Sequence, residues 1–168
     1  MRIVIIGLLY ICFMLAGCPE WLASGSEPLL VRGLTYSFFH ANVFHLAVNC
    51  LAVWCMWNPK WDRSNIRELI LALLVAFVVY PVGPRPCIGF SNVLFAACGL
   101  RIRNFLASWS WRKADILLFY AMMIAMCFFR QFAGLSHLAA YLLGAALAQL
   151  IYAISPIIRD ARRLTAHR

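Results

Sequence analysis

Six apolar segments separated by short loops constrain the fold of this chain more than any other feature. They cover roughly residues 3–18, 35–57, 67–80, 87–100, 114–129 and 134–155. Hydrophobic residues make up 64% of the chain and charged residues 12%, whereas a soluble domain is about 45–50% apolar and about 25% charged. The polar residues are too few to cover a soluble globule, so the sequence predicts an integral protein of the lipid bilayer.

The basic residues predict how these segments are oriented. If the N-terminus is cytoplasmic and each segment crosses once, only three of the 15 Lys and Arg residues fall outside: Arg32, Arg85 and Arg130. Because cytoplasmic loops are enriched in Lys and Arg, we expect both termini to be cytoplasmic. The predicted fold class is therefore all-α, a polytopic six-helix transmembrane domain at 1–158 followed by a basic cytoplasmic tail at 159–168.

The first segment also has an alternative interpretation. Arg2, the apolar run after it and the sequence Leu15-Ala16-Gly17-Cys18 resemble a lipoprotein signal that ends at an acylated cysteine. Removal of such a signal would leave five spans in the same orientation, so the charge pattern is compatible with both interpretations.

Composition argues against two classes of site. The net charge of +9 comes from basic residues between apolar segments, with no basic stretch interleaved with aromatic residues, so we expect no nucleic-acid partner. None of the seven cysteines forms a Cys-x-x-Cys pair, and most lie within apolar runs. We therefore expect neither a zinc site nor a disulfide framework.

Four polar residues interrupt the second apolar segment, which reads YSFFHANVFHLAVN over residues 36–49. His45 and Asn49 are four positions apart, so they lie on one face of a helix. His40 and His45 are five positions apart, or about 140° around a continuous helix, and we expect them not to point to a shared metal. Asn42 has no role that the sequence assigns.

The fourth apolar segment is too short to cross a membrane from surface to surface. The prolines of YPVGPRPCIGFSN break the preceding helix, and about 13 residues from Ile88 to Arg101 span only ~20 Å of a hydrocarbon core of ~30 Å. We therefore expect the helix to begin below the outer surface, with Ser91 in its first turn, where free N–H groups stabilise negative charge. For an isolated serine, a simple helix cap is the more common explanation of the position.

The sixth apolar segment carries His137 near its predicted outer end, where an isolated histidine would be structural. Small residues follow this histidine at Ala139, Ala140, Gly144, Ala145 and Ala148, and the fourth segment has others at Ala96, Ala97 and Gly99. Because small residues allow helices to approach closely, we expect these two helices to pack together and to bring Ser91 and His137 into contact.

These residues together resemble the rhomboid family of intramembrane serine proteases. The motifs are His40-x-x-x-x-His45-x-x-x-Asn49, then Gly89-Phe90-Ser91-Asn92 for the family's Gly-x-Ser, and His137 with Ala140 and Gly144 for its His-x-x-Gly-x-x-x-Gly. Arg32 resembles the arginine of the family's Trp-Arg loop motif, and the resemblance covers nearly the whole chain. Four positions depart from the pattern: Asn92, Ala140, Phe95 and Val31 stand where Gly or Ala, Gly, Tyr and Trp are usual.

The resemblance implies a serine endopeptidase that uses no metal or cofactor. Ser91 would be the nucleophile and His137 its base, and His45, Asn49 and the Ser91 backbone N–H would stabilise the oxyanion. His40, Gly89 and Arg32 would have supporting roles. The substrate would be the transmembrane helix of a membrane protein, cleaved near the outer face of a bacterial inner (cytoplasmic) membrane.

Two other functions stay open on the sequence. The first is a catalytically inactive rhomboid-like protein that binds transmembrane helices, which the unusual Asn92 favours. The second is a small transporter or channel whose histidines relay protons. A proton path would need acidic groups within the spans, but every Asp and Glu lies in a loop, in the tail or at a segment edge.

Overall fold

The computed structural model describes residues 1–16, 28–57, 62–81, 88–107 and 134–166, and all regular secondary structure in these ranges is helical. The elements are α1 (Arg2–Ala16), α3 (Leu29–Thr35), the 3-10 helix η1 (Tyr36–Phe38), α4 (Val43–Met56), α5 (Arg63–Val79), α6 (Ser91–Ala107) and α8 (Gly134–Ala166). The predicted all-α class is confirmed over these ranges. The predicted segment at 114–129 lies outside them, as do Cys18, Arg85 and Arg130.

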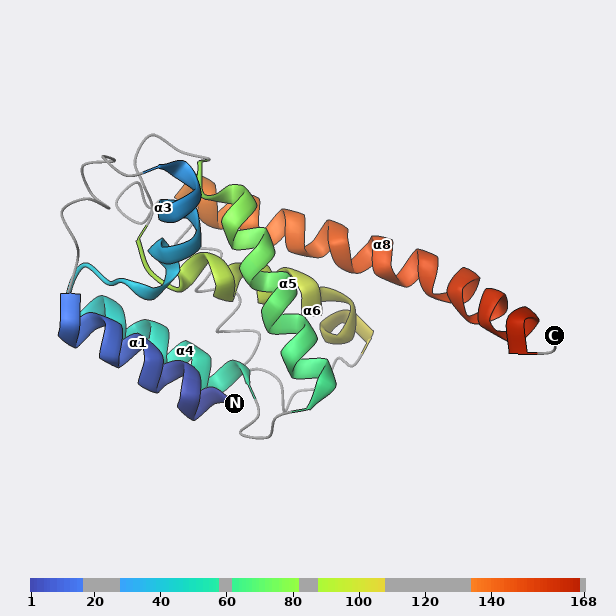
Figure 1. Ribbon diagram of the computed structural model, residues 1–168, viewed down its shortest axis with the longest axis horizontal. Coiled ribbons are helices and arrows are strands. Elements are labelled where there is room, and N and C mark those ends of the chain that lie inside the picture. Colours follow the sequence, from blue (N-terminus) through green and yellow to red (C-terminus); the bar gives the residue numbers. More distant parts are fainter. Residues whose placement is uncertain (17–27, 58–61, 82–87, 108–133, 167–168) are drawn as a thin grey trace.

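Helix α6 lies at the centre of the arrangement. It packs against α5 and most extensively against α8, while α1 packs along α4 (Figure 1). Of the ten residues from Gly89 to Cys98, Ser91 is half-buried and the other nine are buried. The beginning of α6 is therefore enclosed by other elements, whereas α8 extends well beyond the rest of the molecule (Figure 1).

The second apolar segment is not the single helix predicted at 35–57. Helix α4 begins only at Val43, because Asn42 adopts an extended conformation and its side-chain oxygen accepts the His45 backbone N–H at 2.8 Å. The α3–η1 helix pair and α4 are bent by 76° relative to each other. Residue His40 consequently lies in the connection before α4 and not on the helix.

Two other predicted boundaries also move for local reasons. Helix α5 begins at Arg63, one turn before the predicted start at 67, because the Asp62 carboxylate accepts the Asn65 backbone N–H at 2.7 Å. Helix α6 begins at Ser91 and not near Ile88, and it continues beyond Arg101 to Ala107.

Backbone contact between α6 and α8 confirms the prediction from the small residues. A Cβ atom added at Gly99 would contact the Tyr141 carbonyl oxygen and lie 2.7 Å from the Ala145 nitrogen. A Cβ atom added at Gly144 would contact the Ala96 carbonyl oxygen. Since even one methyl group would not fit at either glycine, these residues permit the close approach of the two helices.

Membrane-spanning length is clear for one described helix. The Gly134–Pro156 part of α8 is long and apolar enough to cross a bilayer, and only 11% of its most apolar stretch is buried within the protein. The bent α3–η1 and α4 pair could form a second span, while α1 and Ser91–Ile102 are apolar but shorter. The count of six spans stays a prediction, and α8 continues as a helix into the predicted tail at 159–168.

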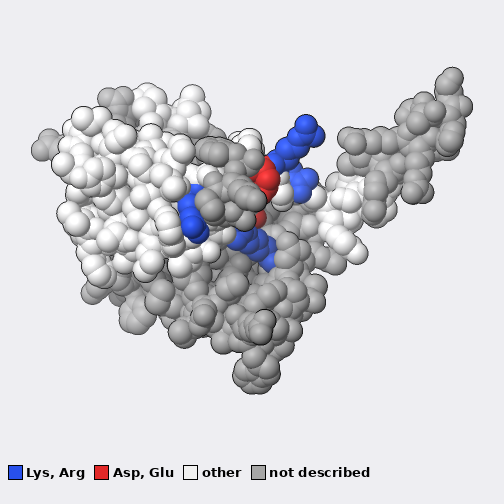
Figure 2. All heavy atoms as spheres, turned by 90° about the horizontal axis from the view of Figure 1, so that it is seen from below, with Lys and Arg blue, Asp and Glu red and all other residues white. Residues whose placement is uncertain are grey.

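Arginine side chains join the helices at the end of α6 far from Ser91. Arg101 forms an ion pair with Glu68 of α5 at 2.8 Å and donates to the Met56 carbonyl at the end of α4. Arg2 lies over the Trp54 ring, with its guanidinium carbon 3.7 Å from the centroid. Among the described residues on the face in Figure 2, the visible charged side chains lie near one another. These contacts connect α1, α4, α5 and α6 where the sequence predicts the cytoplasmic side.

Candidate active site

Ser91 and His137 are hydrogen-bonded to each other. Ser91 is the first residue of α6, and His137 lies in the first turn of α8. The Ser91 Oγ lies 2.8 Å from the His137 Nε2, although the two residues are 46 positions apart in the sequence. Ser91 is half-buried and His137 is buried. The contact follows from the close packing of α6 against α8, because both residues lie at the same end of the helix pair.

The His137 ring is held by stacking on an aromatic ring. Phe95 lies one turn after Ser91 on α6, and its ring is 4.5 Å from the His137 ring between centroids, with an interplanar angle of 7°. The His137 Nδ1 atom is buried and has no hydrogen-bond partner in the described part of the chain. Helix α6 therefore supplies both the hydroxyl that meets His137 and the surface that orients its ring.

Gly89 brings the turn before Ser91 against α4. Its φ angle of +111° belongs to a region that side-chain-bearing residues rarely adopt. A Cβ atom added there would lie 2.6 Å from the His45 Nε2 and 3.3 Å from the Asn49 Nδ2. Both predicted oxyanion side chains therefore face the turn that carries Ser91, as their spacing of four residues predicts.

Asn49 provides a buried side-chain donor beside Gly89. The residue is 3% exposed, and among the residues that the structure describes its Nδ2 atom has no acceptor. An unpaired buried amide costs free energy. Its position beside Gly89, two residues before Ser91, suits a donor for an oxygen that arrives with a substrate.

A family model described as the rhomboid domain matches residues 28–154, which is more than half of the chain. The chain belongs to the rhomboid family. This protein is therefore an integral membrane protein of a family that contains intramembrane serine proteases and inactive homologues. No curated protein matches it.

His40 of this rhomboid lies beside His45, whereas their spacing on a continuous helix predicted an angle of about 140° between them. The ring centroids are 5.1 Å apart and meet edge to face at 64°. The prediction was wrong because it placed both residues on one continuous helix, whereas Asn42 begins α4 after His40. His40 is fully buried, and no metal-binding group of three or more His, Cys, Asp or Glu residues occurs in the described ranges.

Arg32 lies in α3, the helix directly before Tyr36. It is half-buried, and its backbone carbonyl accepts the N–H of Tyr36. Of the three predicted supporting residues, Gly89 and His40 lie around His45, and the Arg32 carbonyl is bonded to the Tyr36 backbone.

Sequence reasoning missed Tyr36 and the contact made by Asn92. The Asn92 side chain is fully buried, and its Nδ2 donates to the Tyr36 hydroxyl at 3.0 Å. No local pattern links these two residues, which are 56 positions apart. The sequence also carries a signal for the role of Asn42, because an Asn directly before an apolar helical stretch is a recognised signal of a helix start.

Proposed function

We propose that this rhomboid is an intramembrane serine endopeptidase with a Ser91–His137 catalytic dyad. Its substrate is the transmembrane helix of a membrane protein, in which it hydrolyses a peptide bond. The observation that carries the proposal is the 2.8 Å contact between the Ser91 Oγ and the His137 Nε2. A serine hydroxyl is a weak nucleophile, and a base within hydrogen-bond reach makes it competent.

The reaction follows the general pattern of an activated serine. Neutral His137 accepts the Ser91 proton at Nε2 while Oγ bonds to the substrate carbonyl carbon, and the histidine then gives that proton to the leaving amine. Water attacks the acyl-enzyme with His137 again as the base, which releases the carboxyl product and restores Ser91. A ring that accepts through Nε2 carries its own proton on Nδ1, and stacking on Phe95 keeps this ring in place.

Three donors are proposed to stabilise the oxyanion: the side chains of His45 and Asn49 and the backbone N–H of Ser91. The proposal for Asn49 is supported by its buried Nδ2, which has no acceptor among the described residues. The Ser91 N–H belongs to the first turn of α6, where backbone donors are free and the helix dipole favours negative charge. Such preorganised donors typically contribute the largest share of catalysis.

We further propose that the site faces the outer side of a bacterial inner membrane, with six spans and cytoplasmic termini. The charge distribution along the sequence supports this orientation. Arg101, ten residues after Ser91 on α6, lies ~15 Å further along the helix axis. The ion pair of Arg101 with Glu68 and the Arg2 contact with Trp54 are at that end of the bundle.

The alternative is an inactive rhomboid that binds transmembrane helices, and it depends on Asn92. A polar side chain directly after the serine could disturb the nucleophile. The Asn92 Nδ2 donates to the Tyr36 hydroxyl, whereas its Oδ1 has no partner among the described residues, and Ser91 still meets His137 at 2.8 Å. These contacts favour the enzyme over the inactive protein.

Covalent labelling of the purified protein by a fluorophosphonate probe tests the proposal. We expect the wild type to label, Ser91→Ala and His137→Ala to lose the label, and Ser64→Ala, a change at an exposed serine of α5, to keep it. Cleavage of a transmembrane reporter in cells should follow the same order. A folded wild type that neither labels nor cleaves would contradict the enzyme and support the helix-binding alternative.

A further inference from the structure

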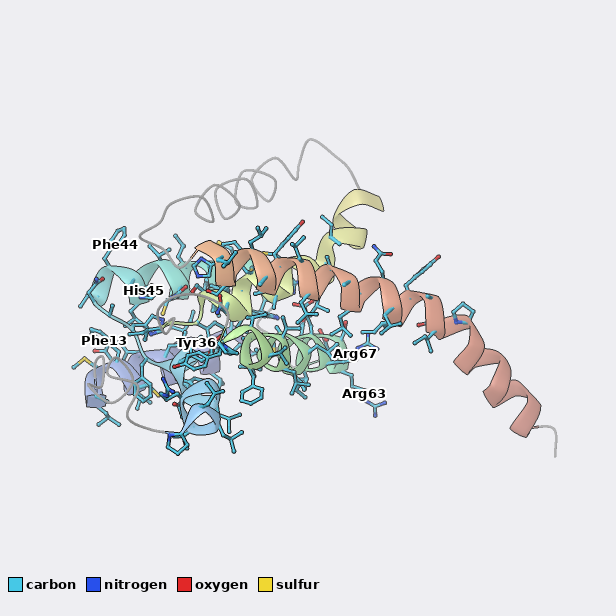
Figure 3. The ribbon with its side chains drawn as sticks, turned by 90° about the horizontal axis from the view of Figure 1, so that it is seen from above. Phe13, Tyr36, Phe44, His45, Arg63 and Arg67 are labelled. Atoms are coloured by element: carbon cyan, nitrogen blue, oxygen red, sulfur yellow. The ribbon has the colours of Figure 1, made fainter. Side chains whose placement is uncertain are left out.

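Tyr36 connects three parts of the molecule through hydrogen bonds. Its hydroxyl donates to the Ala76 carbonyl of α5 at 2.8 Å and accepts from the Asn92 Nδ2 of α6 at 3.0 Å. Its own carbonyl accepts the Gly89 backbone N–H at 3.0 Å. Figure 3 shows Tyr36 directed from η1 toward the end of α5 opposite Arg63 and Arg67. One fully buried residue thus holds α5, α6 and the turn at Gly89 directly before α6.

These contacts lie on both sides of the proposed nucleophile. Gly89 is two residues before Ser91, and Asn92 directly follows it. The backbone that carries Ser91 is therefore attached to Tyr36 at each end of a four-residue stretch. His137 comes from a different helix, so its 2.8 Å contact with Ser91 depends on where this stretch is held.

The Tyr36 hydroxyl satisfies two groups that would otherwise be costly to bury. The Ala76 carbonyl belongs to the last turn of α5, where the Tyr80 N–H bonds to Phe77, so this carbonyl needs a partner from elsewhere. The Asn92 amide is fully buried. Removal of one partner leaves the other group unsatisfied, whereas removal of both partners can be nearly neutral.

We propose that Tyr36 and Asn92 are a positioning pair that holds Ser91 within reach of His137. The inference rests on the proposed protease function and assigns Asn92 a use, where the sequence alone indicated a disturbance. The pair acts through the position of Ser91 and of the first N–H groups of α6, so its loss affects the chemical step more than substrate binding.

The test compares Tyr36→Phe, Asn92→Ala and the double variant with the wild type. The readouts are kcat and KM on a transmembrane peptide, the labelling rate with a fluorophosphonate, and the Tm in the same detergent. We expect Tyr36→Phe to lower kcat and the labelling rate roughly tenfold, with KM changed less than about twofold, because small displacements of reacting groups cost rate steeply.

The variants should also be coupled. Asn92→Ala retains the bond from Tyr36 to Ala76, so we expect a smaller loss of kcat, of about threefold. The double variant removes the amide that Tyr36→Phe leaves unpaired, so it should be no slower than Tyr36→Phe. Tyr80→Phe is the matched control. It removes a hydroxyl from the ring 4.5 Å from Tyr36, leaves the Tyr36 bonds in place and should retain the wild-type kcat.

Three results would overturn the positioning pair. The first is a lower Tm with unchanged kcat per folded molecule in Tyr36→Phe and Asn92→Ala, as expected for a purely stabilising contact. The second is a double variant whose loss of kcat is the product of the two single losses. The third is an equal loss of kcat in Tyr80→Phe.

If Tyr36→Phe does not fold, a wild-type kcat in Asn92→Ala by itself overturns the positioning pair. A folded but inert wild type refutes the proposed function and this inference together, whereas an active wild type with unaffected variants refutes this inference alone.

Discussion

The ring of His137 stacks on Phe95, with centroids 4.5 Å apart and planes 7° from parallel. We predict that Phe95→Leu lowers kcat roughly 2- to 10-fold, because an aromatic pair contributes about 0.5–1.5 kcal/mol to holding the ring. Phe95→Tyr keeps the stacking and should retain activity. Cleavage of a transmembrane reporter by both variants measures this effect, and full activity in Phe95→Leu would show that stacking does not orient the base.

Gly89→Ala should greatly slow the labelling of Ser91. The alanine would have to adopt the positive φ angle of +111°, at about 1–3 kcal/mol of strain, and its Cβ would lie 2.6 Å from the His45 Nε2. The resulting shift of the Ser91 turn should reduce the labelling rate about 100-fold.

Gly7→Ala is the control for this substitution. A Cβ atom there has no neighbouring atom within 4 Å among the described residues, and alanine favours a helix over glycine. We expect unchanged labelling in Gly7→Ala. Equal labelling rates in Gly7→Ala and Gly89→Ala would contradict the close approach of the backbone to α4 at Gly89.

Asn49→Ala should separate activity from stability. Loss of one oxyanion donor typically lowers kcat about 100- to 1000-fold. In the described part of the chain the Asn49 Nδ2 has no acceptor, so its removal should leave the Tm unchanged or slightly higher. Cys50→Ala, a change at the adjacent half-buried position of α4, should affect kcat little. A Tm that falls together with kcat in Asn49→Ala would indicate a structural role.

Gly144→Ala should weaken the packing between α6 and α8. The added methyl group would contact the Ala96 carbonyl oxygen, and overpacking of this kind costs about 1–3 kcal/mol. We expect a lower Tm in detergent and slower labelling of Ser91. Ala146→Leu, at an exposed position of the same helix, should change neither, and a Gly144→Ala variant as stable as the wild type would contradict the proposed tight fit.

Several features of the site follow from the sequence because they depend on local periodicity. The spacing of four residues places His45 and Asn49 on one face of α4, and both face Gly89. The helix-breaking residues before Ser91 predict its place in the first turn of α6, where the helix begins. The small residues of the fourth and sixth segments predict the close contact of α6 with α8, which in turn brings Ser91 to His137.

Tertiary structure decided the features that depend on distant groups or on where a helix begins. The Asn42 Oδ1 accepts the His45 backbone N–H and starts α4 at Val43, and the fold then places the His40 ring beside the His45 ring. The partners of Tyr36 lie 40 and 56 positions away in the chain, at Ala76 and Asn92. A buried hydrogen bond of that kind depends on which groups the fold encloses together, and local sequence carries no signal for it. The sequence by itself thus determined the shared face of His45 and Asn49 and the close packing of α6 with α8, and the packing of α5 and α6 around Tyr36 decided how the Ser91 turn is held.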